Sequence, residues 1–355
     1  MVAFRSMILS LMITSIVTLN EGEDCVMENN SQTGKCVDVY QCDVARKLLQ
    51  TNQRPQHCGF NRQTELVCCP VRKKPLERIS GTVSDAMCKK YHNVMDAPIP
   101  PLGVSNGELA EPLELPHMAA VGYYDGQRTV WLCGGTIISE EFILTASHCA
   151  RHQDYGPPQV IRVGDLDLST SSDIANPQDL PIEEFYTHPT YKAPSVYHDI
   201  ALIKVKRPIV FDFFTQPACL HLNRNIPTTV LQVAGWGKTD FYGDSSSHLM
   251  KANITLVSSK ECSERFPVHR LRMKSGIIDE MHICAGDASG RDTCPGDSGG
   301  PLYFQRECGS SCDILPHFVV VGVTSFGKGC GSEHSIGVYT RVSSYVPWIE
   351  KIVWG

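Results

Sequence analysis

Residues 296–301 read Gly-Asp-Ser-Gly-Gly-Pro, and the serine at their centre is a candidate nucleophile. A serine hydroxyl is a poor nucleophile unless a base takes its proton and N–H groups hold the negative oxygen that develops on the substrate. The glycines that flank Ser298 let the backbone fold tightly enough to aim two amide N–H groups at one point. The motif therefore predicts covalent catalysis by Ser298.

The order of the polar motifs along the chain separates two folds that use such a serine. In the α/β-hydrolases, Gly-x-Ser-x-Gly is a nucleophile elbow, and an acid and then a histidine follow the serine. Only residues 299–355 remain here, without helix–strand alternation. The acid and histidines in that tail are Asp313, His317 and His334. Upstream, His148 lies in Thr-Ala-Ser-His-Cys and Asp199 in His-Asp-Ile-Ala-Leu, which gives the order of chymotrypsin, His, Asp, Ser.

The amino terminus predicts secretion. Arg5 precedes an apolar stretch over residues 7–19, and a polar run follows at 20–24. The stretch is short for a transmembrane helix, which needs about 20 residues, but it suits a signal peptide over residues 1–22, cut between Asn20 and Gly22. We expect a soluble, extracellular protein. The net charge of −6 gives no indication of binding to nucleic acid or to an anionic membrane.

Sixteen cysteines behind a signal peptide indicate eight disulfides. Zinc binding is the alternative, but no paired Cys-x₂-Cys spacings occur and the compartment is oxidising. Two Asn-x-Ser/Thr sequons, at Asn29 and Asn253, are candidate glycosylation sites.

The composition divides the mature chain into three parts. Residues 23–70 hold six cysteines and are too few to bury an adequate apolar core, so we expect a small domain held by disulfides. Residues 71–103 contain several prolines and a basic run, which is typical of a linker, and Cys88 within them must pair elsewhere. The largest part spans residues 104–355.

In residues 104–355, short β-rich runs alternate with turn signals, which favours an all-β sandwich or barrel. The clearest runs are 129–133, 142–145, 160–163, 200–205, 230–234, 319–323 and 338–341. Near the end of the chain, Val346, Ile349 and Val353 share one face of a predicted closing helix over residues 345–353.

With these motifs in this order, residues 104–355 resemble the chymotrypsin-like serine proteases. The resemblance implies two packed six-stranded antiparallel β-barrels with a C-terminal helix. It also implies that His148 is the general base, that Asp199 holds its tautomer and that Ser298 attacks the scissile carbonyl. The N–H groups of Gly296 and Ser298 would form the oxyanion hole.

The chain departs from this family at two positions next to the catalytic motifs. Ser147 stands where the family mostly has alanine, and Pro295 stands where a polar residue is usual. Neither change removes a catalytic group, so activity is expected.

Substrate preference follows from Asp292, six residues before Ser298, which by resemblance forms the floor of the primary pocket. A buried carboxylate there favours a cationic side chain and disfavours apolar ones. Gly327 and Gly337 match the wall positions that must lack side chains for Arg or Lys to enter. The alternative is that Asp292 is an ordinary solvated loop residue.

The segment that ends in Val67-Cys68-Cys69-Pro70 and contains Cys58-Gly59-Phe60 resembles the clip domain of arthropod proteases. Together the two resemblances imply a set of disulfides. In the clip domain they are Cys25–Cys68, Cys36–Cys58 and Cys42–Cys69; in the protease domain they are Cys133–Cys149, Cys262–Cys284 and Cys294–Cys330; Cys88–Cys219 joins linker and protease. A local Cys308–Cys312 bridge is the simplest pairing of the remaining two.

The protease family implies a zymogen whose new α-amine pairs with the Asp before the serine, here Asp297. Val104 aligns with the usual first residue of the active chain, which places activation at Gly103–Val104. Since Gly103 is neither Arg nor Lys, and Ser105 replaces an apolar residue, a protease without trypsin-like specificity is the expected activator. It would cut the Pro-rich stretch 97–103.

The sequence therefore predicts the zymogen of an endopeptidase that cleaves after Arg or Lys in an extracellular cascade of innate immunity, melanisation, clotting or development. Expected partners are a protein substrate such as another zymogen or a pro-ligand, an activating protease and a serpin-type inhibitor. No cofactor or metal is expected, and a calcium site near Asp165 and Asp167 is not predicted because acidic loops are usually solvated. The alternative is a catalytically silent adaptor that binds partners through its clip domain.

Overall fold

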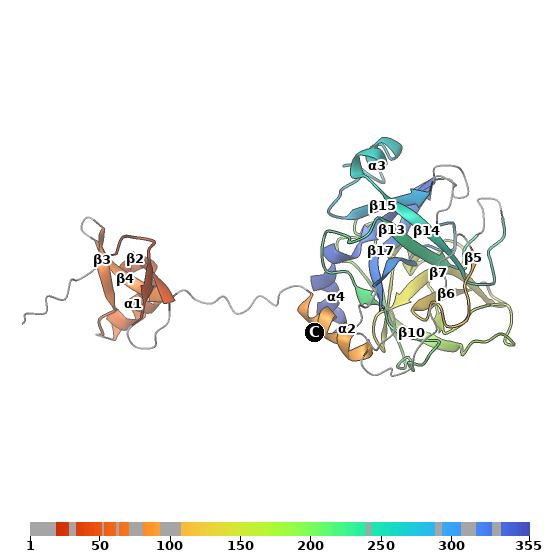
Figure 1. The fold of residues 1–355 in the computed structure, drawn as a ribbon, viewed down its shortest axis with the longest axis horizontal. Helices are drawn as coiled ribbons and strands as arrows, with labels where there is room; N and C mark the ends of the chain where they lie inside the picture. The colour runs from red at the N-terminus through yellow and green to blue at the C-terminus, as the bar shows by residue number, and fades with distance from the viewer. Residues whose placement is uncertain are drawn as a thin grey trace, which may run out of the picture. The chain divides into compact units, whose positions relative to one another are not determined.

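The chain divides into two units, Met1–Glu77 and Arg78–Gly355, in this computed structural model (Figure 1). The structure describes residues 19–27, 33–51, 53–61, 64–70, 81–92, 108–238, 243–287, 293–306, 317–328 and 335–355.

The first unit is a four-stranded antiparallel sheet in the order β1-β2-β4-β3. Its strands are β1 (Asp24–Val26), β2 (Thr33–Asp38), β3 (His57–Asn61) and β4 (Thr64–Pro70). The 3-10 turn η1 (Val39–Gln41) and helix α1 (Asp43–Gln50) bring Val39 and Ala45 against Val67, in a small apolar core.

Three disulfides join the elements of this unit: Cys25–Cys68, Cys36–Cys58 and Cys42–Cys69. They are the pairs that the clip-domain resemblance implies. Because the apolar core is so small, these disulfides provide much of the stability of the unit by restricting the unfolded chain.

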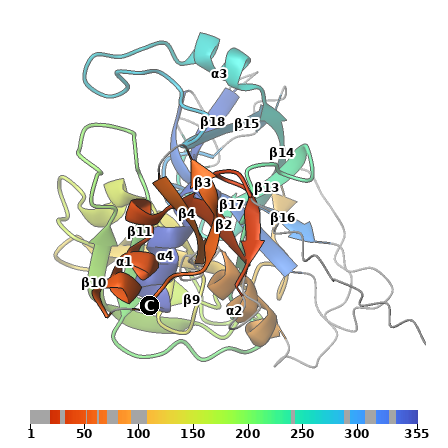
Figure 2. The same cartoon turned by 90° about the vertical axis from the view of Figure 1, so that its left-hand side faces the viewer.

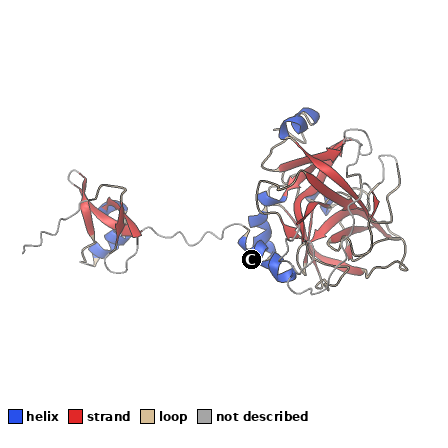
Figure 3. Ribbon diagram, viewed as in Figure 1, coloured by secondary structure: helices blue, strands red, loops and turns tan. Residues whose placement is uncertain are grey.

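The second unit contains two six-stranded antiparallel barrels, as the resemblance predicts. In the first, the strands close in the order β10-β11-β8-β7-β6-β9. They are β6 (Met118–Tyr124), β7 (Thr129–Ile137), β8 (Phe142–Thr145), β9 (Val160–Val163), β10 (Gln178–Thr187) and β11 (Ala201–Val205). Figure 3 shows the strands of this unit in red, with loops between them and only short helices.

The second barrel closes because β17 pairs with both β16 and β18. Its strands are β13 (Val230–Gly235), β14 (Met250–Val257), β15 (His282–Asp287), β16 (Pro301–Arg306), β17 (His317–Lys328) and β18 (Ser335–Arg341). Two short strands extend it: β5 (Glu108–Leu109) pairs with β14, and β12 (Cys219–Leu220) pairs with β17. All seven β-rich runs identified in the sequence lie almost entirely within strands of the two barrels.

Each barrel is filled by β-branched and aliphatic side chains. Ile143, Leu144 and Ile161 are fully buried in the first barrel. Leu302 and Val319 are fully buried in the second. Their burial on strands that close on themselves leaves the loops at the strand ends to carry the polar groups.

Short helices lie outside the barrels. Helix α3 (Ser259–Arg265) is tied to β15 by Cys262–Cys284. The closing helix is α4 (Val346–Val353), which follows the turn η3 (Val342–Ser344), and it buries Val346 and Ile349 as expected. Within the described residues, no helix has both the length and the apolar character needed to cross a bilayer.

Part of the segment expected to be a linker is a helix that the sequence did not indicate. Helix α2 (Thr82–His92) lies against α4 (Figures 1 and 2). Cys88 bonds to Cys219, and the backbone N and hydroxyl of Ser84 donate to the Glu350 carboxylate at 2.8 and 2.9 Å. The helix is therefore an integral part of the protease unit.

Candidate active site

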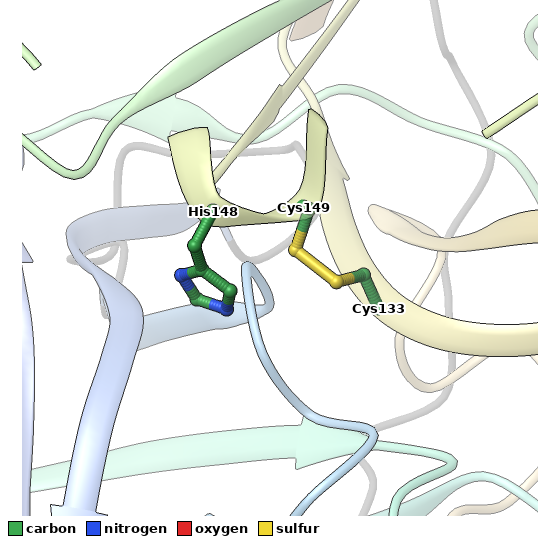
Figure 4. Close-up of side chains that lie close together, drawn as sticks. All are labelled: Cys133, His148 and Cys149. Carbon is green, nitrogen blue, oxygen red and sulfur yellow. A yellow bond between two sulfur atoms is a disulfide. The ribbon is translucent and has the colours of Figure 1, made fainter. Parts of the chain in front are cut away.

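His148 lies on the 3-10 turn η2 (Ser147–Ala150), directly after β8. The disulfide Cys133–Cys149 joins this turn to β7, and Figure 4 shows the imidazole beside it. The two sulfur atoms and an imidazole nitrogen lie within 4.8 Å of one another. Because both sulfurs are in the disulfide, this group is not a metal site.

Asp199, just before β11, holds the imidazole in one orientation. Its Oδ2 atom lies 2.8 Å from Nδ1 of His148, and its Oδ1 atom accepts the His148 backbone N–H at 2.9 Å. Because an ionised carboxylate only accepts hydrogen bonds, Nδ1 carries the hydrogen and Nε2 is the basic nitrogen. Nε2 is therefore the atom that can take a proton from a nucleophile.

The pKa values of this pair move apart in the directions that favour an ion pair. Burial acts to lower the pKa of His148, but the charge of Asp199 and the hydrogen bond to it outweigh burial and raise that pKa. Burial acts to raise the pKa of Asp199, but the charge of His148 and hydrogen bonds from His148 and Ser325 lower it. The imidazolium that forms during proton transfer is thereby stabilised.

Two further side chains position Asp199, and no sequence motif pointed to them. The Ser325 hydroxyl donates to Oδ2 of Asp199 at 2.5 Å, and the Thr340 hydroxyl donates to its backbone oxygen at 2.8 Å. Both come from the second barrel, on β17 and β18, so Asp199 is held across the boundary between the barrels. The Asp199 carboxylate stays ionised because it accepts hydrogen bonds from Ser325 and from both the backbone N–H and the ring of His148.

The departure at Ser147 has a structural role. Its buried hydroxyl donates to the backbone oxygen of Ile200 at 2.6 Å. This bond joins the turn that carries His148 to the segment before β11 that carries Asp199, and alanine could not make it.

The loop that carries Ser298 lies beside the turn of His148. The Ser298 backbone oxygen accepts from Gly134 N at 2.7 Å and lies 3.6 Å from the sulfur of Cys149. Among the described residues, the hydrogen bonds of His148 both go to Asp199, and none joins Nε2 to Ser298. Such bonds are often long in an unliganded enzyme and close when substrate binds.

Two glycines on this loop occupy positions where only glycine fits. Gly296 has φ +107°, and a Cβ there would lie 2.7 Å from the Cα of Gly237. Gly299 has φ +80°, and its Cβ would lie 2.1 Å from the hydroxyl of Thr145. Both glycines are therefore needed for this loop conformation.

The loop presents two N–H donors that have no acceptor among the described residues. The Pro295 oxygen accepts from Lys238 N at 2.9 Å. Because the C=O and N–H of a trans peptide point in opposite directions, the N–H of Gly296 points away from Lys238. Within the described part of the chain, neither this N–H nor that of Ser298 donates a hydrogen bond. The pair can hold an oxyanion, and Pro295 does not prevent it.

Asp297 points back into the protein. Its carboxylate oxygens accept the backbone N–H groups of Gly237 and Cys294, both at 2.9 Å. The residues of the predicted activation bond, Gly103 and Val104, lie outside the described residues.

Strands β17 and β18 place the two predicted wall glycines opposite each other, since Gly327 and Gly337 are direct partners in the ladder. Asp292 lies outside the described residues. Its neighbour Thr293 lies beside β18, where its hydroxyl is 3.3 Å from the Tyr339 hydroxyl.

The other predicted sites are covered unevenly. Asn29 lies outside the described residues, as do Cys308, Cys312 and Cys330, while Cys294 is disulfide-bonded. Asn253 lies half-buried on β14, where its amide oxygen accepts from Gln232, so its glycosylation stays a prediction. Asp165, near which no calcium site was predicted, pairs with Arg162 at 3.3 Å.

Comparison with known proteins gives relatives over almost the whole chain. The trypsin family matches residues 104–349. Serine protease snk of Drosophila melanogaster is 36% identical over 94% of this chain and 79% of its own length. CLIP domain-containing serine protease B4 of Anopheles gambiae is 32% identical over 98% and 96%.

Among solved structures, the Drosophila Grass clip serine protease of the Toll pathway aligns with a TM-score of 0.61 and 26% identity. That alignment covers 93% of this chain and 97% of the Grass chain. The two predicted resemblances are thus confirmed together: this chain belongs to the trypsin family and is an arthropod clip-domain serine protease.

Proposed function

We propose that this chain is a secreted zymogen whose active form cleaves proteins after Arg or Lys in an extracellular proteolytic cascade. The observation that supports the chemistry best is the Asp199–His148 pair beside the Ser298 loop. Two N–H groups on that loop donate to no acceptor in the part of the chain that the structure describes. This is the arrangement that acyl transfer from a peptide bond requires.

In the proposed mechanism, Nε2 of His148 takes the proton of the Ser298 hydroxyl as its oxygen attacks the scissile carbonyl. The N–H groups of Gly296 and Ser298 hold the resulting oxyanion, and Asp199 stabilises the imidazolium. His148 then gives the proton to the departing amine, which leaves an acyl-enzyme. A water molecule, deprotonated by the same imidazole, hydrolyses that ester.

The proposed specificity rests on Asp292 at the floor of the primary pocket. The pairing of Gly327 with Gly337 supports it, because walls without side chains leave room for a long cationic side chain. An Arg or Lys side chain would pair with the carboxylate, whereas an apolar side chain would leave that charge unpaired.

The relatives support the cascade role. They include Phenoloxidase-activating enzyme 1 of Spodoptera litura, 30% identical over 95% of this chain, besides the Grass protease of the Toll pathway. We propose that the substrate is likewise a protein, either another zymogen or a pro-ligand. An upstream protease would activate the chain and a serpin-type inhibitor would stop it, outside the cell.

We propose that activation cuts Gly103–Val104 and that the new α-amine of Val104 pairs with Asp297. The Asp297 carboxylate already accepts two backbone N–H groups, and a buried ammonium would balance its charge. Helix α2 and Cys88–Cys219 would keep the cleaved amino-terminal part attached.

The test is activation of the purified zymogen in body fluid, followed by amino-terminal sequencing and a peptide-amide assay. The heavy chain should begin Val-Ser-Asn-Gly, and activity should appear with it. A different first residue would refute the assigned bond. A cleaved heavy chain that labels with no serine-directed probe and hydrolyses no Arg or Lys peptide would refute the proposed function.

A further inference from the structure

A depression of about 270 Å³ lies next to the proposed primary pocket, with which it shares Gly327. Its lining includes Val196, Phe266, His269, Arg272, Phe326 and Lys328, and also Gly327, the proposed wall of the primary pocket. Because the depression shares Gly327 with that pocket, it lies on the side of the residue that precedes the scissile bond. An extended substrate would therefore pass it.

Strand β17 provides the path to this depression. Its partner β16 pairs only as far as Val323, so residues 326–328 pair with β18 alone among the described strands, after a register shift at Ser325. The path starts at the catalytic centre, since the Ser325 hydroxyl binds Asp199. An added strand advances about 3.3 Å per residue, so substrate residues two to four positions before the scissile bond would lie along 325–328.

The outer side of the depression is a wall formed by residues 266–276. Arg272 O accepts from Val196 N at 3.0 Å. The Tyr197 hydroxyl donates to Gly276 O at 2.9 Å and accepts from Ser275 N at 2.8 Å. These three bonds fix the wall to the loop that leads into Asp199, so its side chains are positioned before substrate arrives.

The charged side chains in the lining are all basic. The lining contains His269, Arg272 and Lys328, and no acidic residue among those described. Lys328 is partly used, since its Nζ donates to Arg265 O at 2.7 Å and lies over the Phe266 ring. The Arg272 side chain forms no ion pair within the described part of the chain, and its charge acts to lower the pKa of His148, so it lies within electrostatic reach of the catalytic base.

We propose that this depression is a cationic subsite, in which Arg272 selects protein substrates that carry an acidic side chain two to four residues before the scissile bond. The subsite deepens, and rests on, the proposed protease function. Phe266 and Phe326 would hold the aliphatic part of a Glu side chain while Arg272 takes its carboxylate in a bidentate pair.

The test compares peptide amides that end in Arg and differ only in Glu, Gln or Lys at one of these three positions. The full chain is activated through an enterokinase sequence that replaces residues 99–103, and enzyme concentration is set by active-site titration. At low salt the wild type should prefer Glu over Lys by roughly 3- to 10-fold in kcat/KM at one position, since exposed ion pairs are worth little. Arg272→Ala should remove most of this preference and Arg272→Glu should reverse it.

Arg270→Ala is the matched control, because Arg270 lies on the same wall, is exposed and does not line the depression. It should keep the Glu preference. Arg272→Ala should also move the acid limb of the pH–rate profile to higher pH, because the Arg272 charge lowers the pKa of His148.

An unchanged Glu-to-Lys ratio in Arg272→Ala, or an equal loss in Arg270→Ala, would overturn the subsite. If the subsite is overturned but every variant still cleaves the Gln peptide, the proposed protease function stands. Failure of the wild type to cleave any of the peptides would instead count against the proposed function.

Discussion

Replacing Asp199 by asparagine should lower kcat of the activated protease by about 10⁴-fold. Asparagine has nearly the same shape, but its amide group can donate a hydrogen bond to Nδ1. That would leave the hydrogen on Nε2, the nitrogen that must accept the proton of Ser298. It also removes the negative charge that stabilises the imidazolium. In the wild type this charge is buried and accepts a hydrogen bond from Ser325.

The pH dependence gives the same test a second readout. His148 must be neutral to act as a base, so wild-type kcat/KM should rise through a midpoint above 6.5, the ordinary pKa, since Asp199 raises it. In Asp199→Asn only burial and the Arg272 charge remain, both of which lower that pKa, so the midpoint should fall. Asp165→Asn makes the same change at another buried aspartate and should keep near wild-type kcat. A loss below about 10-fold in Asp199→Asn would contradict the assigned role.

The second large effect concerns the primary pocket. The activated protease should cleave a peptide that ends in Arg at least about 10³-fold faster, in kcat/KM, than the same peptide that ends in Phe. Asp292→Ser should abolish most of this difference by slowing the Arg peptide, because the guanidinium would then enter a pocket without a countercharge. Active-site titration separates this effect from misfolding.

Equal rates for the two wild-type substrates, or preference for Phe, would refute Asp292 as the pocket floor. Retention of the full Arg preference in Asp292→Ser would do the same. A uniform loss on both substrates would show that Asp292 supports the loop rather than the pocket charge.

The sequence predicted the fold and the contact between His148 and Asp199 because local motifs mark both. The positions of Gly296 and Gly299 leave no room for a side chain, so the loop conformation requires glycine there and can be recognised in the sequence. His148 and Asp199 are recognised from their flanking residues and their order. Short apolar runs separated by turns predicted the strands, and in the structure these strands form closed sheets.

Features that depend on contacts between distant segments could not be recognised in the sequence. Ser325 and Thr340 reach Asp199 only after the two barrels pack, and a lone Ser or Thr on a strand has no motif. Helix α2 was missed because its stability comes from Cys88–Cys219 and the Glu350 carboxylate rather than from its own apolar pattern. Arg272 was missed because its loop is placed by hydrogen bonds to Val196 and Tyr197, which are distant in the sequence.

Labelling of the activated full-length chain with a fluorophosphonate, followed by mass-spectrometric mapping, tests the triad most directly. We predict one modified residue, Ser298, with no label in Ser298→Ala and greatly slowed labelling in His148→Ala. An unlabelled Ser298 in the correctly cleaved chain would contradict the account and favour a catalytically silent adaptor.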